Sequence, residues 1–245
     1  MGKVDKYLNW VRIKVNICKK IIQWLPQSGF RGCALCRALT SEMVCQDCYT
    51  FLPHFKPGCN RCGYPILSLN SNYYCDECEQ IEPAFDSILA LFHYIWPVHF
   101  WIRKLKFEHK LEIAHFFGQK MAESFSLLIK PDVIVPVPLH IQRHRQRGFN
   151  QSIEIAQPIS QYYEIPLCSK SLQRIKCTRT QRELNYEERK RNVESAFIAR
   201  SEVKGRAILL IDDVITTGAT AHAASLALKQ AGATHVQVWS VCRSC

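Results

Sequence analysis

Residues 208–220 read Ile208-Leu209-Leu210-Ile211-Asp212-Asp213-Val214-Ile215-Thr216-Thr217-Gly218-Ala219-Thr220 and decide the fold. The four apolar residues at the start predict a strand buried on both faces, as in a parallel sheet. The two acids fall at the predicted carboxyl end of this strand, where open α/β sheets bind ligands. The small residues 216–220 can turn backbone N–H groups toward an anion, and the alanine-rich stretch 221–231 predicts a helix whose N-terminus favours phosphate. Because carboxylates bind diol hydroxyls, the stretch indicates a sugar-phosphate site.

A plain structural interpretation of the same residues is a buried strand, an acidic turn and a capped helix. That interpretation leaves the adjacent Asp212 and Asp213 and the run Thr216–Thr220 unexplained. The loop is not a Walker A loop, since no Gly-Lys-Ser/Thr follows, and it lacks the Gly-x-Gly-x-x-Gly pattern of dinucleotide sites. The sequence therefore argues against nucleoside triphosphates and NAD as ligands.

The composition limits the number of domains and the compartment. A chain of 245 residues, 47% of them hydrophobic, is long enough for one domain of ordinary size and a smaller one. Eight of its thirteen cysteines form four Cys-x-x-Cys pairs within residues 33–78, a spacing that favours metal over disulfides and hence a reducing, cytoplasmic location. No stretch approaches the roughly 18 apolar residues of a membrane span, so we expect no stable membrane insertion. The formal charge of +11 favours polyanionic ligands without distinguishing nucleic acid from a sugar phosphate.

The four cysteine pairs predict two closed zinc sites, because zinc takes four thiolates tetrahedrally and a two-residue spacer presents two sulfurs from one turn. Pairing in sequence order gives two zinc ribbons; interleaved pairing, as in cross-brace domains, is the alternative. Four protein ligands leave no position for a reactive water, so we expect both ions to be structural. In sequence order the ligands are Cys33, Cys36, Cys45 and Cys48, and then Cys59, Cys62, Cys75 and Cys78.

The cysteine-rich module either folds around zinc and does nothing more, or also provides a docking surface. Side chains that could stack on bases or bind phosphate there are Arg61, Tyr64, Tyr73 and Tyr74. A fifth Cys-x-x-Cys pair has no partner pair. We therefore interpret Cys242 as strand packing and Cys245 as a frayed chain end.

Three parts follow one another along the chain. Residues 1–30 place apolar side chains at helical intervals among Lys and Arg, which predicts an amphipathic segment that packs on the protein or, alternatively, lies on a membrane surface. Residues 31–82 form the double zinc ribbon, and residues 85–245 form the second domain. There we expect strands at 87–94, 132–138, 204–211 and 235–241, and helices at 98–107, 111–129, 152–163 and 221–230. This βαβα order implies an α/β fold with a mostly parallel sheet and helices on both faces.

Two polar segments of the second domain are candidates for ligand contact. The loop at 139–152 follows the predicted strand at 132–138, and its cations suit pyrophosphate; a solvated basic loop is the plain alternative. The segment 167–197 is long and poor in apolar residues, which predicts a mobile lid.

Several separated motifs resemble known families. Residues 208–220 closely resemble the phosphoribosyl pyrophosphate (PRPP) motif of type I phosphoribosyltransferases. With the cysteine pairs in front, the order of motifs over residues 30–242 is similar to that of the ComF/GntX family of competence proteins. The motifs are Pro136-Val-Pro138-Leu139, Arg147-Gly-Phe-Asn-Gln151, Thr180-Gln181-x-x-Leu184, Arg191-Asn192-Val193, Ala196-Phe197 and Asp212–Thr220. The resemblance implies a type I phosphoribosyltransferase fold behind a double zinc ribbon, and a role with DNA taken up in natural transformation or used as a nutrient.

The resemblance also implies roles for single residues. Asp212 and Asp213, as the catalytic acids, would hold the ribose hydroxyls of PRPP. Leu139 and His140 would flank pyrophosphate, with Arg147 as a further candidate, and Mg²⁺ would neutralise this group as it leaves. The 5-phosphate would be cradled by Thr216, Thr217, Gly218, Ala219 and Thr220.

Two functional hypotheses remain open from the sequence. The chain is either a phosphoribosyltransferase acting on an unidentified acceptor, or a non-catalytic module of this fold that binds single-stranded DNA or a competence-machinery protein. No segment typical of binding a purine, a pyrimidine or ammonia is recognisable. For DNA, the candidate phosphate contacts are Arg103, Lys104, Arg143 and Arg145.

Overall fold

The computed structural model describes residues 32–56, 58–65, 73–80, 82–127, 129–176 and 196–244. The chain divides into two compact units, residues 1–52 and 53–245. The first cysteine cluster belongs to the first unit, and the second cluster belongs to the second unit together with the sheet. The separation into a ribbon at 31–82 and a domain at 85–245 stays a prediction. The segment predicted at 1–30, most of the predicted lid and Cys245 lie outside the described residues.

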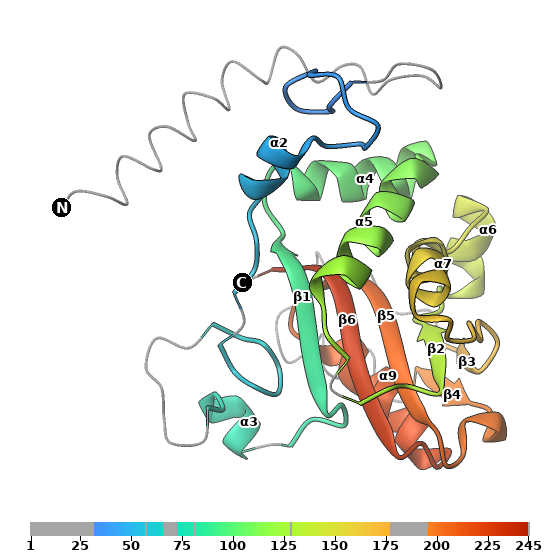
Figure 1. Cartoon of the computed structure of the whole chain (residues 1–245). Helices are drawn as coiled ribbons and strands as arrows, with labels where there is room; N and C mark the ends of the chain where they lie inside the picture. Colours follow the sequence, from blue (N-terminus) through green and yellow to red (C-terminus); the bar gives the residue numbers. More distant parts are fainter. Residues whose placement is uncertain are drawn as a thin grey trace. The chain divides into compact units, whose positions relative to one another are not determined.

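A parallel sheet forms the centre of the second unit (Figure 1). Within the described residues its four strands lie in the order β1 (Ser87–His93), β6 (His235–Arg243), β5 (Ala207–Ile215) and β2 (Val133–Pro136). Every neighbouring pair is parallel. One face is covered by α5 (Leu111–Ser124) and α7 (Gln151–Tyr163), and the other by α9 (Ala219–Gln230). The predicted α/β class, with helices on both faces of a parallel sheet, is confirmed.

Strand β6 is buried along nearly its whole length, although polar and apolar residues alternate in its sequence. It lies between β1 and β5, and helices cover both faces, so both sets of alternating side chains enter the core. Trp239 is fully buried there, with its ring 5.0 Å from that of Phe125 and 6.0 Å from that of Tyr163. This packing holds the strand against which the acid-bearing β5 is paired.

Helix α5 ends at Ser124, earlier than the predicted end at 129. The next residue, Phe125, is extended and packs its ring on Trp239. Its carbonyl oxygen accepts the hydroxyl of Tyr163 at 2.6 Å, and this contact ties the end of α5 to the end of α7. The helix therefore stops because tertiary contacts use the groups that would continue it.

The cation-rich segment predicted as a loop at 139–152 contains a short helix, α6 (Ile141–Arg147). His140 caps its N-terminus by accepting the backbone N–H of Gln142, and Gly148, at φ 73°, ends it. The basic side chains are consequently distributed around a helix instead of lining a loop.

Two aspartates fasten the amino ends of the strands, each placed directly before an edge strand. The Asp86 carboxylate accepts the backbone N–H of Val236 at 2.7 Å, and the Asp132 carboxylate accepts that of Ala207 at 2.8 Å. Burial alone would raise the pKa of Asp86, but the Lys229 ammonium 2.8 Å away, the Val236 N–H and the charge of His235 together outweigh it and lower this pKa. These contacts set the amino ends and leave the carboxyl ends of the sheet for ligands.

Helices α5 and α7 are in close contact at Gly118. A Cβ atom at this position would overlap the carbonyl oxygen of Ile155 and crowd Pro158 of α7. Glycine thus allows both helices to lie on the same face of the sheet, together with α4 (Val98–Glu108). Nowhere in the described part of the chain is a helix both long and apolar enough to cross a bilayer.

The two ends of the predicted lid form an antiparallel pair of short strands. Strand β3 (Leu172–Arg174) pairs with β4 (Phe197–Ala199), and a short 3-10 helix, η2 (Ser201–Val203), leads on to β5. Residues 177–195, between these strands, lie outside the described residues, so the predicted lid stays a prediction.

Candidate functional site

The acid pair lies inside β5 and not at its end, where the sequence predicted it. The two residues that follow continue the ladder by pairing with Cys242 and Arg243 of β6. Since successive side chains of a strand point to opposite faces, Asp212 and Asp213 face different layers of the fold. Asp213 faces the α7 layer, and Asp212 faces the α9 layer.

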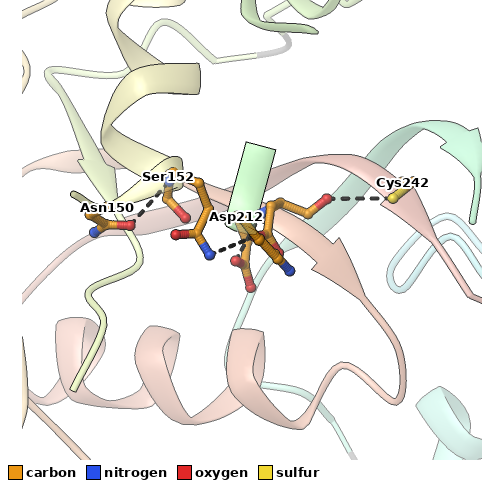
Figure 2. A network of polar contacts seen from close by, with 7 residues as sticks. Asn150, Ser152, Asp212 and Cys242 are labelled. Carbon is orange, nitrogen blue, oxygen red and sulfur yellow. Dashed lines mark hydrogen bonds and ion pairs between the residues drawn. The ribbon is translucent and has the colours of Figure 1, made fainter. Parts of the chain in front are cut away.

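Asp213 is buried, with 5% of its surface exposed, and its carboxylate is paired. Its Oδ2 lies 2.8 Å from Lys106 Nζ, near the end of α4, and accepts Gln151 Nε2 of α7 at 2.9 Å. Figure 2 shows this network between Asn150 on one side and Cys242 on the other. The Cys242 thiol, buried in β6 as predicted, donates a weak bond to the Asp213 carbonyl at 3.6 Å. The acid therefore connects β5 to two helices.

Asn150 sets the start of α7. Its Oδ1 accepts the backbone N–H of Ser152 at 3.1 Å (Figure 2). Its Nδ2 donates to the carbonyl of Val137, just beyond β2, at 3.0 Å. This buried amide caps the helix and attaches it to the carboxyl end of the sheet. The following residue, Gln151, is thereby held where it reaches Asp213.

Asp212 is half-buried and behaves differently from its neighbour. Its Oδ1 accepts the backbone N–H of Asp213 at 2.8 Å. Burial, followed by the negative charge of Asp213, raises the pKa of Asp212 to about 7, although Lys106 and Arg174 oppose the rise. Near neutral pH this carboxyl is shared between its protonated and ionised forms, a behaviour that is frequent at functional sites.

The turn after β5 leads directly into α9. Gly218 has φ 79°, a left-handed conformation that favours glycine, and α9 begins at Ala219, two residues before its predicted start. The turn is closed by a long bond of 3.3 Å from the Ala219 N–H to Thr217 Oγ1. Gly218 has no side chain to cap the helix, and the N-terminus of a helix, where backbone N–H groups point outward, favours an anion.

Arg147 lies on the same side as Asp213. Its guanidinium is half-buried, 5.5 Å from the ring centre of Phe107. Burial lowers the pKa of Arg147 and the charge of Asp213 opposes this, so the two groups are within electrostatic reach. Leu139 and His140 are partly exposed between β2 and α6.

Sequence reasoning missed Lys106 and Gln151 as members of this network. Lys106 ends a basic run, and Gln151 ends the motif that begins at Arg147, so both stood in segments already singled out. Their meeting at one carboxylate oxygen joins three segments that are distant in the chain. Only the packing of α4 and α7 against β5 brings them together.

The cysteines form two separate clusters in sequence order, which excludes interleaved pairing. In each cluster the four sulfurs lie within 4.8 Å of one another. Each combines a Cys-x-x-Cys turn with a second pair at the start of a short helix, α2 (Gln46–Thr50) or α3 (Asp76–Gln80). Four thiolates in this arrangement fit a tetrahedral zinc ion.

Backbone N–H groups point at the sulfurs in both clusters. Cys33 Sγ accepts the N–H of Leu35 at 3.4 Å and that of Cys45 at 3.3 Å, and Cys59 Sγ accepts that of Cys75 at 3.4 Å. Burial alone would raise the pKa of Cys33, but backbone N–H bonds outweigh it and lower this pKa to about 7. These N–H groups thus favour the thiolate form of Cys33, which is the form that binds zinc.

The residue after each Cys-x-x-Cys turn repeats one conformation. Arg37 has φ 65° and Gly63 has φ 70°. For the arginine this left-handed conformation costs about 1 kcal/mol, whereas glycine adopts it freely. Gly63 is needed for space as well, because a Cβ there would lie 3.2 Å from the carbonyl oxygen of Ile88.

Three of the four side chains predicted to contact nucleic acid in the second cluster, Arg61, Tyr64 and Tyr74, have protein partners. Arg61 pairs with Glu82 at 2.9 Å and lies over the Tyr74 ring at 4.8 Å. The guanidinium of Arg243 lies over the Tyr64 ring at 5.7 Å. Arg61 and Tyr64 therefore help to build the cluster.

We expect the purified chain to contain two zinc ions, because each cluster supplies four sulfurs of suitable spacing. Elemental analysis combined with a thiol count measures this directly. Replacing one ligand of either cluster, as in Cys36→Ser or Cys62→Ser, should lower the content toward one ion. A content of one or none with all eight cysteines intact and reduced would contradict the assignment.

Comparison with known proteins finds relatives that this chain matches over almost their whole length. The chain is 31% identical over 227 residues to competence protein F of Haemophilus influenzae, covering 86% of this chain and 96% of that protein. It is 35% identical over 221 residues to DNA utilization protein YhgH of Escherichia coli K12, with the same coverage. Competence protein ComFC of Bacillus subtilis is 30% identical over 242 residues, covering 92% of this chain and 96% of that protein. No protein-family model matches the chain.

Among solved structures, the PRPP amidotransferase of B. subtilis complexed with ADP and GMP matches 52% of this chain and 25% of that protein, at 24% identity and a TM-score of 0.37. The purine phosphoribosyltransferase of Pyrococcus horikoshii matches 56% of this chain and 84% of that protein, at 17% identity and a TM-score of 0.31.

A parallel sheet whose acid-bearing strand runs through a Thr-Thr-Gly turn into a helix defines a phosphoribosyltransferase-like α/β protein, here carrying two four-cysteine clusters. The chain belongs to the family of competence protein F and DNA utilization protein YhgH. The resemblance drawn from the sequence motifs is confirmed.

Proposed function

We propose that the chain binds PRPP at the carboxyl end of β5 and transfers its phosphoribosyl group to an acceptor during DNA utilisation or natural transformation. The observation that carries the proposal is the continuous unit formed by Asp212, the left-handed Gly218 and the N-terminus of α9. A carboxylate and a helix N-terminus suit one ligand that bears both hydroxyl and phosphate groups. The free thiols of the Cys-x-x-Cys pairs support a cytoplasmic location, and the relatives suggest competence-machinery proteins as partners.

Each part of PRPP has its own binding residues in this proposal. The two acids accept hydrogen bonds from the ribose hydroxyls, and Asp212 is the more accessible because Lys106 and Gln151 already hold Asp213. The turn at 216–220 and the N-terminus of α9 bind the 5-phosphate. The pyrophosphate lies toward Leu139, His140, Arg147 and Lys106.

The reaction breaks the bond between ribose C1 and pyrophosphate, which leaves with the electron pair. C1 then bonds to the acceptor, which releases a proton. Positive charge develops on the ribose as pyrophosphate departs, so the protein contributes positioning and electrostatics, and no side chain acts as a nucleophile. Arg147 and Lys106 supply positive charge beside the leaving group. Mg²⁺ held by phosphate oxygens and a carboxylate would add to this neutralisation.

PRPP-dependent release of pyrophosphate tests the proposal. The purified chain, PRPP and Mg²⁺ are combined with nucleobases, nucleosides or oligonucleotides, and released pyrophosphate is measured. Release that requires one acceptor class establishes both transfer and its substrate. Binding of PRPP without release for any acceptor supports the non-catalytic alternative, whereas absence of PRPP binding overturns the proposal.

Affinity for ribose 5-phosphate should increase with pH up to about 7. Asp212 accepts hydroxyl groups best as a carboxylate, and its raised pKa of about 7 means that acidification below this value protonates it before binding. The expected loss is about tenfold per pH unit below 7, with a plateau above. Calorimetric titration across this range measures it. The phosphate of the ligand itself ionises near about pH 6, and this contribution is the same in Asp212→Asn, which is therefore the control. If affinity depends on pH equally in both proteins, the role of Asp212 is contradicted.

A second candidate function, binding of single-stranded DNA without chemistry, is favoured by a basic–aromatic patch around the end of α4 and α6. Phe107 is 65% exposed and carries the guanidinium of Arg147, and the rings of His109 and Phe149 lie 5.1 Å apart. Rings interleaved with cations bind unpaired bases and phosphates together. The patch consists of Phe107, His109, Arg147 and Phe149, and Arg143 lies within electrostatic reach of Arg147.

Binding of single-stranded DNA to this patch should weaken steeply with salt, by about 0.7 log units per neutralised phosphate for each tenfold increase in salt. Phe107→Ala should lower the affinity several-fold without changing the salt slope, because it removes only stacking. Tyr162→Ala, at an exposed aromatic residue near the end of α7, is the matched control. Fluorescence anisotropy with labelled strands measures both effects. Equal affinity for single and double strands would reduce the candidate to nonspecific charge attraction.

A further inference from the structure

We infer that the second cysteine cluster sets the position of the phosphate-binding turn at 216–220, and that Arg243 is the positioning residue that connects them. The identity of the turn rests on the proposed function, whereas the connection rests on contacts alone. The second cluster and the sheet belong to one compact unit. The cluster consists of Cys59, Cys62, Cys75 and Cys78.

The Cys-x-x-Cys turn of this cluster lies on the outer edge of β1. The backbone N–H of Ile88 donates to the carbonyl of Arg61 at 2.8 Å, and Gly63 packs against the carbonyl of Ile88. Because β1 is an edge strand of the sheet, this turn covers backbone groups that would otherwise be unpaired. The conformation of the cluster is thereby coupled to the edge of the sheet.

Arg243 carries the connection to the end of β5. Arg243 is buried, with 4% of its surface exposed, and its Nη1 donates to the carbonyl of Cys62. Its backbone is in register with Ile215, and the N–H of Ser244 donates to the Ile215 carbonyl at 2.8 Å. A buried guanidinium depends on fixed acceptors, since an unsatisfied one is costly. Ile215 directly precedes the turn, so displacement of the Cys62 carbonyl would be transmitted to it.

The other end of the turn, where α9 begins, is held by the segment that follows the second cluster in the sequence. Ala84, which follows the cluster in sequence, donates its backbone N–H to His222 Nδ1 at 3.1 Å. His222 lies in the first turn of α9, and its own N–H donates to the carbonyl of Gly218 at 2.8 Å. Both flanks of the phosphate-binding turn therefore contact the cluster or the segment that leaves it. Metal bound by the four sulfurs would fix both contacts at once.

The test compares Cys62→Ser with Cys36→Ser in the full chain. The two residues occupy the same position in their turns but belong to different compact units. Zinc content confirms that each variant has lost one ion. Cys62→Ser should lower the affinity for ribose 5-phosphate about tenfold, a size usual for coupled sites, and should accelerate amide exchange at 216–222. Cys36→Ser should leave both quantities unchanged.

Arg243→Gln provides a second variant if Cys62→Ser does not fold. It should retain two zinc ions yet show faster amide exchange at 216–222 and the same loss of affinity. Equal effects of Cys36→Ser and Cys62→Ser, or unchanged exchange in Arg243→Gln, would overturn the inference. If the unaltered chain does not bind ribose 5-phosphate, the proposed function fails, while the exchange comparison still decides whether cluster and turn are coupled.

Discussion

Asp213→Asn is expected to lower the free energy of unfolding by about 3 kcal/mol, because it leaves the Lys106 ammonium without its partner in a largely buried position. The substitution preserves the shape of the side chain and an acceptor for Gln151, so the loss of stability measures the contribution of the Asp213 charge. Urea denaturation at about pH 8 measures it, with the slope against urea checked for constancy.

The matched control is Asp212→Asn, one residue away in the same strand. Its carboxyl has a pKa raised toward 7 by burial and by Asp213, so its ionisation opposes folding above the pKa of an unfolded aspartate, about 3.9. Removing this charge should leave stability unchanged or increase it at about pH 8. A further variant, Lys106→Met with Asp213→Asn, should recover part of the loss because no buried charge remains unpaired. Equal stability of the two single variants would contradict the ion pair.

Asp212→Asn is also expected to weaken PRPP binding by at least about 100-fold. A carboxylate that accepts two hydroxyl groups contributes roughly 1.5–3 kcal/mol per bond, and every 1.4 kcal/mol corresponds to a factor of ten. Calorimetric titration with PRPP, and separately with ribose 5-phosphate and pyrophosphate, locates the loss. Ribose 5-phosphate should lose affinity in parallel, whereas pyrophosphate should not.

Glu112→Gln serves as the control for this substitution, since it removes an exposed carboxylate at the start of α5. Its ligand affinities should equal those of the unaltered chain. Unchanged PRPP affinity in folded Asp212→Asn would remove this acid from the proposed site. Loss of pyrophosphate affinity to the same degree would indicate a general electrostatic effect.

Local patterns predicted the elements of the fold well and their ends poorly. The apolar run 208–211 does form a strand buried on both faces, and its α/β context follows from the order of elements. The predicted end of α5 was wrong because Phe125 contacts Trp239 and Tyr163 only in the folded chain. The full burial of β6 does not follow from its alternating pattern, because polar residues such as Gln237 give no sign that a helix covers them.

The sequence alone was sufficient for the four cysteine pairs and for the strand, turn and helix of the candidate site, whereas the grouping of the pairs into two clusters came from the structure. These features are local: a two-residue spacer places two sulfurs in one turn, and Gly218 permits the left-handed conformation that starts α9. The tertiary structure decided the state of the acids. Lys106 and Gln151 come from two helices to hold Asp213, and burial leaves Asp212 with a raised pKa. Charge and ionisation depend on groups that meet only when distant segments pack, and no spacing in the chain records that meeting.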